Sequence, residues 1–402
     1  MKLILLTAGG RAGSDFFHSL LDGHSQILQF PGYFRVDKNL KLILETKNLK
    51  KKGEMFVKFY PEFFNSRKNK LERWNRLGQE RNEYFKVDHK NFVKNFYKIS
   101  LKKKKLEKWN KLGQERNKYF KEFKKKFVKN FYKIFLKKKN SINNYECLIN
   151  LHLAYFITRK KNIESTKIIF VHTHLLSWTK EFIKLFNIKS VDILHTIRHP
   201  LSSLSSPVKS WLNFENGKYF FSKDLYYQID TVVNCIYDLN KLGKLHIIRL
   251  ESLHKQNTFL MKKFCKKFKI KYEVSLRKST KNNLKWWGDK INKKYMSGIN
   301  KRFKIKIYEK HFYVRDLIFF QNLTKKIIKK YNYNFYYEQK NISFNLLPMK
   351  CEIDVWKNTF KNSLYGGFRW KHLVSIPFFY ILRIFMINNL HQYFKTKNLP
   401  NE

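Results

Sequence analysis

The feature that most constrains the fold is a series of short apolar runs, each followed by a segment with helical periodicity. The runs are 3–7 (LILLT), 167–173 (KIIFVHT), 190–197 (SVDILHTI) and 244–250 (KLHIIRL). Continuous apolar runs of this length are typical of strands buried on both faces of a sheet. Strands that alternate with helices favour a parallel sheet. We therefore predict an α/β fold with a parallel central sheet flanked by helices.

The segments that follow the runs carry apolar residues at helical spacing. After the first run, the pairs Phe16–Phe17 and Leu20–Leu21 form a stripe that Gly23 closes. Residues 254–268 follow the last run and are also expected to form a helix.

A lysine-rich block separates the first run from the second and contains a tandem repeat with a period of 35 residues. Residues 71–104 match 106–139 at all but eight positions. Apolar stripes indicate helices, and two copies are too few for a repeat array, which needs about three units. We predict a duplicated helical insertion, 65–140, that hangs from a domain spanning 1–340. It is either a binding arm or has no specific role.

The remainder of the chain, 341–402, is predicted to be a helical extension. Its apolar stretch, 373–387, is interrupted by Pro377 and Arg383 and is too short to span a bilayer. Two interpretations stay open: a helix packed on the core, and a helix that lies on a membrane interface, which suits a basic, aromatic-rich chain.

The chain is strongly basic, with a formal net charge of +54. Such a surface attracts nucleic acid, acidic glycan or anionic lipid through long-range fields. The simpler interpretation is that lysine fills solvent-facing positions. Because the sequence contains no recognised RNA-binding module, we expect no specific nucleic-acid partner.

The four cysteines, Cys147, Cys235, Cys265 and Cys351, are far apart, and no histidine cluster has metal-ligand spacing. This pattern indicates reduced, mostly buried thiols and no metal site. The first apolar run is too short for a signal peptide, and no run reaches about 18 apolar residues. We therefore expect a cytoplasmic protein, with peripheral membrane contact through 373–387 as an open alternative.

The first candidate site is the turn Thr7–Ser14 (TAGGRAGS), between the first strand and its helix. Glycines let the backbone approach a phosphate, Arg11 adds a guanidinium, and Ser14 adds a hydroxyl. The turn matches neither Gly-x4-Gly-Lys-Ser/Thr nor Gly-x-Gly-x-x-Gly, which disfavours an ATP-hydrolysing P-loop and a dinucleotide site. The alternative is a tight turn with a surface arginine.

The second candidate site is ILHTIRHPLSSLSS, 193–206. Arg198 follows a strand, and Ser206 lies eight residues further on, so the two can converge on one phosphate. Alternatively, Ser202 or Ser203 caps the next helix.

The spacing R-A-G-S-x-F-F-x-x-L-L-D-x-H, followed by I-R-H-P-x-x-x-x-x-S, resembles the sulfotransferase family. HIIRLESL (246–253) is similar to its Arg-x-Glu-x-Leu turn, and SLRKSTKNNLKWWGD (275–289) to its basic loop over the nucleotide. The resemblance covers 1–34 and about 165–290. Each motif alone has low specificity, but the four occur in the family's order. It implies a P-loop NTPase-like sulfotransferase fold, with 3′-phosphoadenylyl sulfate (PAPS) as donor and no metal.

The resemblance also implies roles for individual residues. Arg11 stands where many relatives have a lysine that stabilises the leaving group. The residues expected at the 5′-phosphosulfate are Arg11, Ala12, Gly13, Ser14 and Asp15. Asp15 departs from the usual Thr or Ser and would repel the donor unless it faces away or caps the helix. The residues expected at the 3′-phosphate are Arg198 and Ser206, reinforced by Arg277 and Lys278.

The stretch IIFVHTHLLSW, 168–178, resembles the K-T-H-L-P segment of the cytosolic branch, whose histidine is the general base. His174 would then accept the acceptor's proton, with His172 in the lysine's place. An unperturbed histidine pKa of about 6.5 suits this role. SQILQFPGYF contains no carboxylate to act as base, as carbohydrate-directed relatives have. Either histidine alternatively only ends a strand.

The expected function is sulfuryl transfer from PAPS to a hydroxyl or amine of a glycan, lipid or small molecule. Two alternatives remain. A non-enzymatic polyanion- or RNA-binding protein accounts for the charge, and a nucleotide-dependent phosphotransferase accounts for the P-loop-like turn but would need magnesium.

Overall fold

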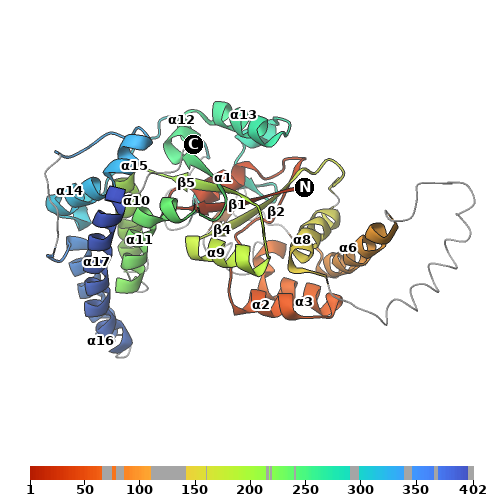
Figure 1. Cartoon of the computed structure of the whole chain (residues 1–402), viewed down its shortest axis with the longest axis horizontal. Helices are drawn as coiled ribbons and strands as arrows, with labels where there is room; N and C mark the ends of the chain where they lie inside the picture. Colours follow the sequence, from red (N-terminus) through yellow and green to blue (C-terminus); the bar gives the residue numbers. More distant parts are fainter. Residues whose placement is uncertain are drawn as a thin grey trace, which may run out of the picture.

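The centre of the molecule is a five-stranded parallel sheet with strand order β2-β4-β1-β5-β6 (Figure 1). Its strands are β1 (Lys2–Ala8), β2 (Ile27–Gln29), β4 (Ile168–His174), β5 (Asp192–Ile197) and β6 (Lys244–Arg249). This computed structural model describes residues 1–65, 75–77, 86–109, 142–159, 161–213, 217, 220–239, 241–289, 298–338, 346–365 and 370–396. The predicted α/β class with a parallel central sheet is confirmed, and the four predicted strands are present.

Strand β1 supplies side chains to the cores on both faces of the sheet. Leu3 and Leu5 belong to one buried cluster, whereas Ile4 and Leu6 belong to another. Successive side chains of a strand point to opposite faces, so a strand covered on both sides must be apolar at every position. This explains why the run at 3–7 is continuous.

Helices cover both faces of the sheet. The helices on the first face are α2 (Lys38–Glu45), α3 (Leu49–Phe59), α4 (Pro61–Phe64), α6 (His89–Trp109), α8 (Asn144–Thr158) and α9 (Leu176–Leu185). Those on the second are α1 (Ser14–Leu20), α12 (Leu250–Lys255) and α13 (Asn257–Phe268). The single helix predicted over 254–268 is divided, because Gln256 leaves the helical region at φ −126° and ψ 33°.

A third helical cluster lies beside the sheet, at the left of Figure 1. Its helices are α10 (Pro200–Asn213), α11 (Ser222–Leu239), α14 (Val314–Leu323), α16 (Lys350–Tyr365) and α17 (Trp370–Thr396). Helix α15 (Lys325–Lys330) follows α14 but buries Ile327 and Ile328 in the core of the first face. Leu204 of α10, Phe320 of α14 and Val355 of α16 are buried together. The last helix, α17, packs on α11 and α16. No helix in the described part of the chain is long and apolar enough to cross a membrane.

The lysine-rich block departs in two ways from the predicted insertion, 65–140. Helix α6 carries Phe92 and Phe96, which are fully buried in the main core against α3 and α8. This part of the block is therefore built into the domain and does not hang from it. Residues Asn75–Leu77 form a strand, β3, that pairs antiparallel with β8 (Leu284–Asp289), where we expected helix. Most of the second copy, 110–139, lies outside the described residues.

A short hairpin follows the main sheet and precedes the third cluster. It consists of β7 (Thr280–Lys281) and β8, after a 3₁₀ turn, η2 (Val274–Arg277). A further 3₁₀ turn, η3 (Glu309–His311), leads into α14. The side of η2 that faces the protein contributes Leu276 to the core under α1.

Three of the four cysteines have described side chains, and all three are free thiols buried in the protein: Cys147, Cys265 and Cys351. Burial raises the pKa of the Cys147 and Cys265 thiols to about 11. They are therefore protonated packing residues, as the sequence predicts. The side chain of Cys235 lies outside the described part of the chain.

Candidate active site

The carboxyl ends of the parallel strands meet at one edge of the sheet, and most of the predicted site residues lie there. β1 runs into the glycine turn, β4 ends at His174, and β5 is followed by Arg198. Because β1 lies between β4 and β5, the turn is flanked by His174 on one side and by Arg198 on the other. The structure thus brings together residues that are far apart in sequence.

The glycine turn is tight and is fixed by packing on two sides. The amide of Ala12 donates to the carbonyl of Gly9 at 3.0 Å. Gly13 has φ 84°, and a Cβ there would lie 2.4 Å from Cδ1 of Leu250. A Cβ at Gly10 would lie 2.3 Å from the side-chain oxygen of Gln228. Glycine is therefore required by conformation at position 13, whereas at position 10 a larger residue would need the Gln228 side chain to move.

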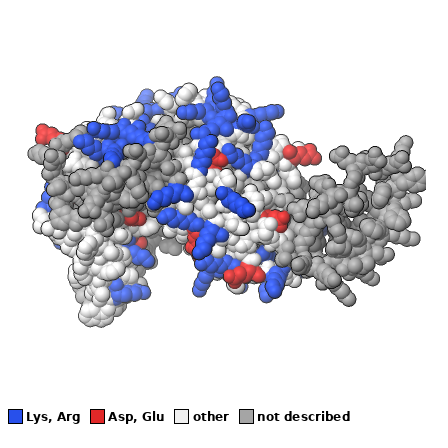
Figure 2. All heavy atoms as spheres, viewed as in Figure 1, with Lys and Arg blue, Asp and Glu red and all other residues white. Residues whose placement is uncertain are grey.

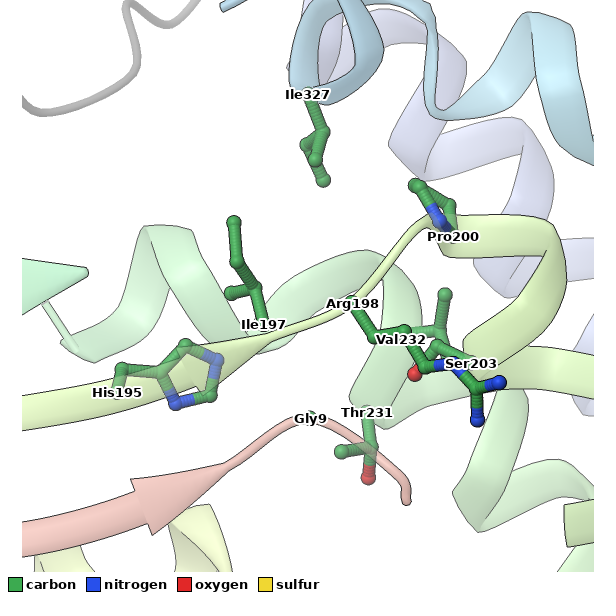
Figure 3. Close-up of a pocket in the computed structure, with 9 residues that line it drawn as sticks. All are labelled: Gly9, His195, Ile197, Arg198, Pro200, Ser203, Thr231, Val232 and Ile327. Atoms are coloured by element: carbon green, nitrogen blue, oxygen red, sulfur yellow. The ribbon is translucent and has the colours of Figure 1, made fainter. Parts of the chain in front are cut away.

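A small pocket opens between the glycine turn and the β5–α10 connection (Figure 3). It is lined by Gly9, His195, Ile197, Arg198, Pro200, Ser203, Thr231, Val232 and Ile327. The Ser203 hydroxyl donates to the carbonyl of Gly10 at 2.5 Å, which ties α10 to the turn. The Nε of Arg198 is buried and has no hydrogen-bond partner within the described residues. Burial lowers the pKa of Arg198 from its usual value, and Arg11 lowers it further.

The serines after Arg198 do not act as helix caps, so that alternative is wrong. Helix α10 begins at Pro200, which suits the first helical position because proline needs no amide partner there. The Ser202 hydroxyl donates to the carbonyl of Lys306 at 2.6 Å, and Ser203 binds the glycine turn. Ser206 lies further along α10 and is 7% exposed. Its role in binding a 3′-phosphate stays a prediction.

Glu251 fixes the connection that carries Arg198. The backbone amide of His199 donates to Oε1 of Glu251 at 2.9 Å, and the Tyr333 hydroxyl donates to Oε2 at 3.1 Å. The guanidinium of Arg249 lies 4.4 Å from the centre of the Tyr333 ring. These contacts hold the ends of β5 and β6 together and place a carboxylate near Arg198.

On the other side of the turn, two histidines lie next to the start of α1. The Nδ1 atom of His174 is 3.3 Å from Nε2 of His172. The His174 ring stacks on Tyr33, with centroids 5.1 Å apart. The backbone of His174 is in the left-handed region, with φ 67°. Burial lowers the pKa of His174, and Lys281 and Arg11 lower it further although Asp15 raises it. The ring is therefore neutral near pH 7.

Asp15 does not cap α1, one of the two arrangements that would keep its charge from repelling the donor. The residue before α1 is Gly13, without a side-chain cap, and the Asp15 carboxylate pairs with Lys281 at 2.9 Å. Burial alone would raise the pKa of Asp15. Lys281, His172 and His174 outweigh this effect and hold it well below its usual range. The negative charge is thus compensated within the site.

Lys281 is the site residue that sequence reasoning missed. Its side chain is 1% exposed, and it reaches Asp15 from the β7–β8 hairpin. The two residues predicted from the same loop are exposed at the surface, and Nε of Arg277 donates to the Tyr272 hydroxyl at 2.8 Å. The assignment of Arg277 and Lys278 to a 3′-phosphate stays a prediction.

Within the described residues, no three His, Cys, Asp or Glu side chains are arranged to hold a metal ion. No family model matches the chain, and neither does any curated protein. Among solved structures, the chain is similar to a sulfotransferase domain from the curacin biosynthetic pathway, with TM-score 0.37 and 13% identity over 83% of this chain and 99% of that one. A sulfotransferase domain from the olefin synthase of Synechococcus PCC 7002 gives TM-score 0.35 and 10% identity, over 83% and 95%. TM-scores below 0.5 are too low to assign a function.

Proposed function

We propose that this protein transfers a sulfuryl group from PAPS to a hydroxyl or amine of a glycan, lipid or small molecule. The observation that carries the proposal is the hydrogen bond from Ser203 to Gly10, which joins the glycine turn to the connection bearing Arg198. These segments follow the neighbouring strands β1 and β5, whose connections lead to opposite edges of the sheet, from β1 to β2 at one edge and from β5 to β6 at the other. Open α/β sheets bind ligands at such a switch point.

The residues at this edge fit an anion with two phosphate groups. The buried Nε of Arg198 is a donor without a partner in the described part of the chain, and a phosphate would satisfy it. Arg11 and the backbone of the turn would hold the phosphosulfate, and Arg198 with Ser206 would hold the 3′-phosphate. The charge of Asp15, which would otherwise oppose binding, is compensated by Lys281.

The residues near the turn also fit the chemistry of transfer. PAPS supplies the sulfuryl group and a phosphate leaving group. As the acceptor oxygen or nitrogen bonds to sulfur and the bond from sulfur to the bridging oxygen breaks, Arg11 would neutralise the charge left on the phosphate. The acceptor's proton would pass to Nε2 of His174, because Nδ1 faces His172. Neutral His174 is in the form that accepts a proton.

The first experiment is calorimetric titration of the full chain with adenosine 3′,5′-bisphosphate at two salt concentrations. We expect micromolar binding that resists salt, and a loss of at least about tenfold in Arg198→Ala, because a charged hydrogen bond is worth about 1.5–3 kcal/mol. The matched control is Lys263→Ala, which removes one exposed positive charge from α13. If binding weakened equally in both variants and vanished with salt, the polyanion-binding alternative would be favoured.

The second experiment is transfer of radiolabel from PAPS to fractionated cell extract, with Arg11→Ala as the inactive control. Labelled acceptor in the wild-type reaction alone supports the proposal. A dependence on magnesium would instead favour a phosphotransferase.

A further inference from the structure

Helix α17 presents a row of large apolar side chains to solvent. The row consists of Trp370, Val374, Phe378, Ile381 and Phe385, and each is between 50% and 68% exposed. At about 100° per residue, these five positions fall within an arc of about 80° on one side of the helix. Soluble proteins rarely expose a contiguous apolar surface unless it binds something.

A buried ion pair determines which side of α17 faces outward. Arg383 is 1% exposed, and its Nε and Nη2 atoms donate to the two carboxylate oxygens of Glu352 on α16 at 2.9 and 2.8 Å. Nη2 also donates to the carbonyl of Leu347 at 3.2 Å. Arg383 projects about 180° from the middle of the apolar row. The charge that interrupts the apolar stretch in sequence is therefore absent from the outward face.

The segment before α16 widens the apolar surface. Leu346 and Leu347 are 53% and 56% exposed, and the Tyr380 hydroxyl of α17 donates to the carbonyl of Leu346. We call the row on α17 together with these two leucines the α17 face. In Figure 1 the α16–α17 pair projects from the rest of the molecule, and in Figure 2 the lowest part of that projection is predominantly white.

The exposed charges described on α16 and α17 are lysines, and Lys371 adjoins Trp370 at the start of the α17 face. Lys357, Lys361 and Lys371 are exposed on α16 and α17. The carboxylates described on these helices have partners: Glu352 pairs with Arg383, and Asp354 with His311 and Lys350. Each lysine near an anionic membrane adds about 1 kcal/mol of attraction. The charge is thus complementary to anionic lipid.

We propose that the α17 face docks this protein on the surface of an anionic phospholipid membrane, with α17 lying in the interface. Large apolar and aromatic side chains exposed on one side of a helix are what an interfacial helix inserts into a bilayer, and the net charge of +54 attracts the chain to anionic lipid. A two-fold dimer through the same face would bring two strongly basic chains together, which like-charge repulsion opposes. The ion pair to α16 keeps α17 along the surface of the protein, so the helix lies on the bilayer and does not cross it.

The test is co-sedimentation of the full chain with vesicles of phosphatidylcholine and phosphatidylserine. Nonspecific attraction of a chain with net charge +54 is removed by working at about 0.5 M salt, where the Debye length is only a few ångströms. The test variant is Phe378→Asp/Phe385→Asp. The control is Phe259→Asp, which changes a 64% exposed phenylalanine on α13. Circular dichroism confirms that each variant is folded.

We expect the wild type and Phe259→Asp to stay bound in salt, and the double variant to lose binding by about tenfold or more. The proposal would be overturned if the wild type, the double variant and Phe259→Asp bound the vesicles equally well in salt. It would also be overturned if salt released all three proteins from the vesicles. A concentration-dependent dimer in light scattering that the double variant abolishes would also overturn it, because a second copy would then cover the face.

Discussion

The Nζ atom of Lys281 lies 2.9 Å from Oδ1 of Asp15, and this ion pair joins the start of α1 to the β7–β8 hairpin. The lysine side chain is almost fully buried, whereas the aspartate side chain is 33% exposed. The pair lies beside the two histidines at the end of β4, since His172 and His174 both lower the pKa of Asp15. It therefore sets the charge of the proposed donor site.

The first prediction concerns this pair. Lys281→Met leaves the Asp15 carboxylate without its partner, so we expect a loss of about 2 kcal/mol in the free energy of unfolding and weaker binding of adenosine 3′,5′-bisphosphate. Urea unfolding and calorimetric titration measure the two effects. In the double variant Asp15→Asn/Lys281→Met, the free energy of unfolding and the affinity for adenosine 3′,5′-bisphosphate should both largely recover. Equal losses in the single and double variants would show that the pairing itself is unimportant.

The second prediction concerns His174 as general base. Asparagine tolerates the left-handed backbone at this position, so His174→Asn removes the base with little backbone strain. We expect turnover to fall by about 10²- to 10⁴-fold while nucleotide binding is retained. Steady-state transfer assays and titration separate these effects, and near-normal turnover would show that His174 is not the base.

The third prediction is the pH dependence of the reaction. Burial holds the pKa of His174 below 6.5, so the ring becomes protonated, and stops accepting protons, only on the acid side of that value. Turnover should therefore be constant near pH 7 and decline below pH 6.5. The acid limb that belongs to His174 should be missing from the residual activity of His174→Asn. A decline centred above pH 7 in the wild type contradicts the assignment.

The fourth prediction concerns stability in acid. Burial lowers the pKa of His152 to about 4, so below pH 6.5 the unfolded chain binds a proton that the folded chain does not. As the pH falls from 6.5 to 4, this histidine should reduce the free energy of unfolding by up to about 1.4 kcal/mol for each pH unit. His152→Phe, in a pocket already lined by Phe30 and Phe34, should flatten that dependence. Urea midpoints at pH 7 and pH 5 compare the two proteins.

The fifth prediction tests the glycine turn. Gly13→Ala places a Cβ at φ 84° and 2.4 Å from the Leu250 side chain, so we expect a loss of about 1–3 kcal/mol of stability. Leu250→Ala in the same chain removes the clash but not the backbone strain. The double variant should therefore be less unstable than the sum of the two single changes, as measured by thermal and urea unfolding.

The central sheet could be predicted from the sequence because its inner strands are buried on both faces and are largely apolar at consecutive positions. The run at 3–7 shows this directly. The other two runs also contain buried polar residues, which are His172 and Thr173 in 167–173 and Asp192, His195 and Thr196 in 190–197. The three-residue strand β2 was missed because it is too short to show a pattern. The glycine turn after β1 and Arg198 after β5 could also be predicted, since turn residues and charges end an apolar run abruptly.

The sequence by itself determined the fold class, the four longer strands of the central sheet and the two segments that approach at the sheet edge. Only the tertiary structure decided that Lys281 reaches Asp15, that Ser203 binds the turn, and that Arg383 faces Glu352 and leaves an apolar helix face outside. Strand patterns are local, because burial acts on neighbouring positions along the chain. Partners of charged and hydroxyl groups are set by the distance between segments. In a chain with 84 lysines and arginines, composition cannot indicate which of these residues are buried.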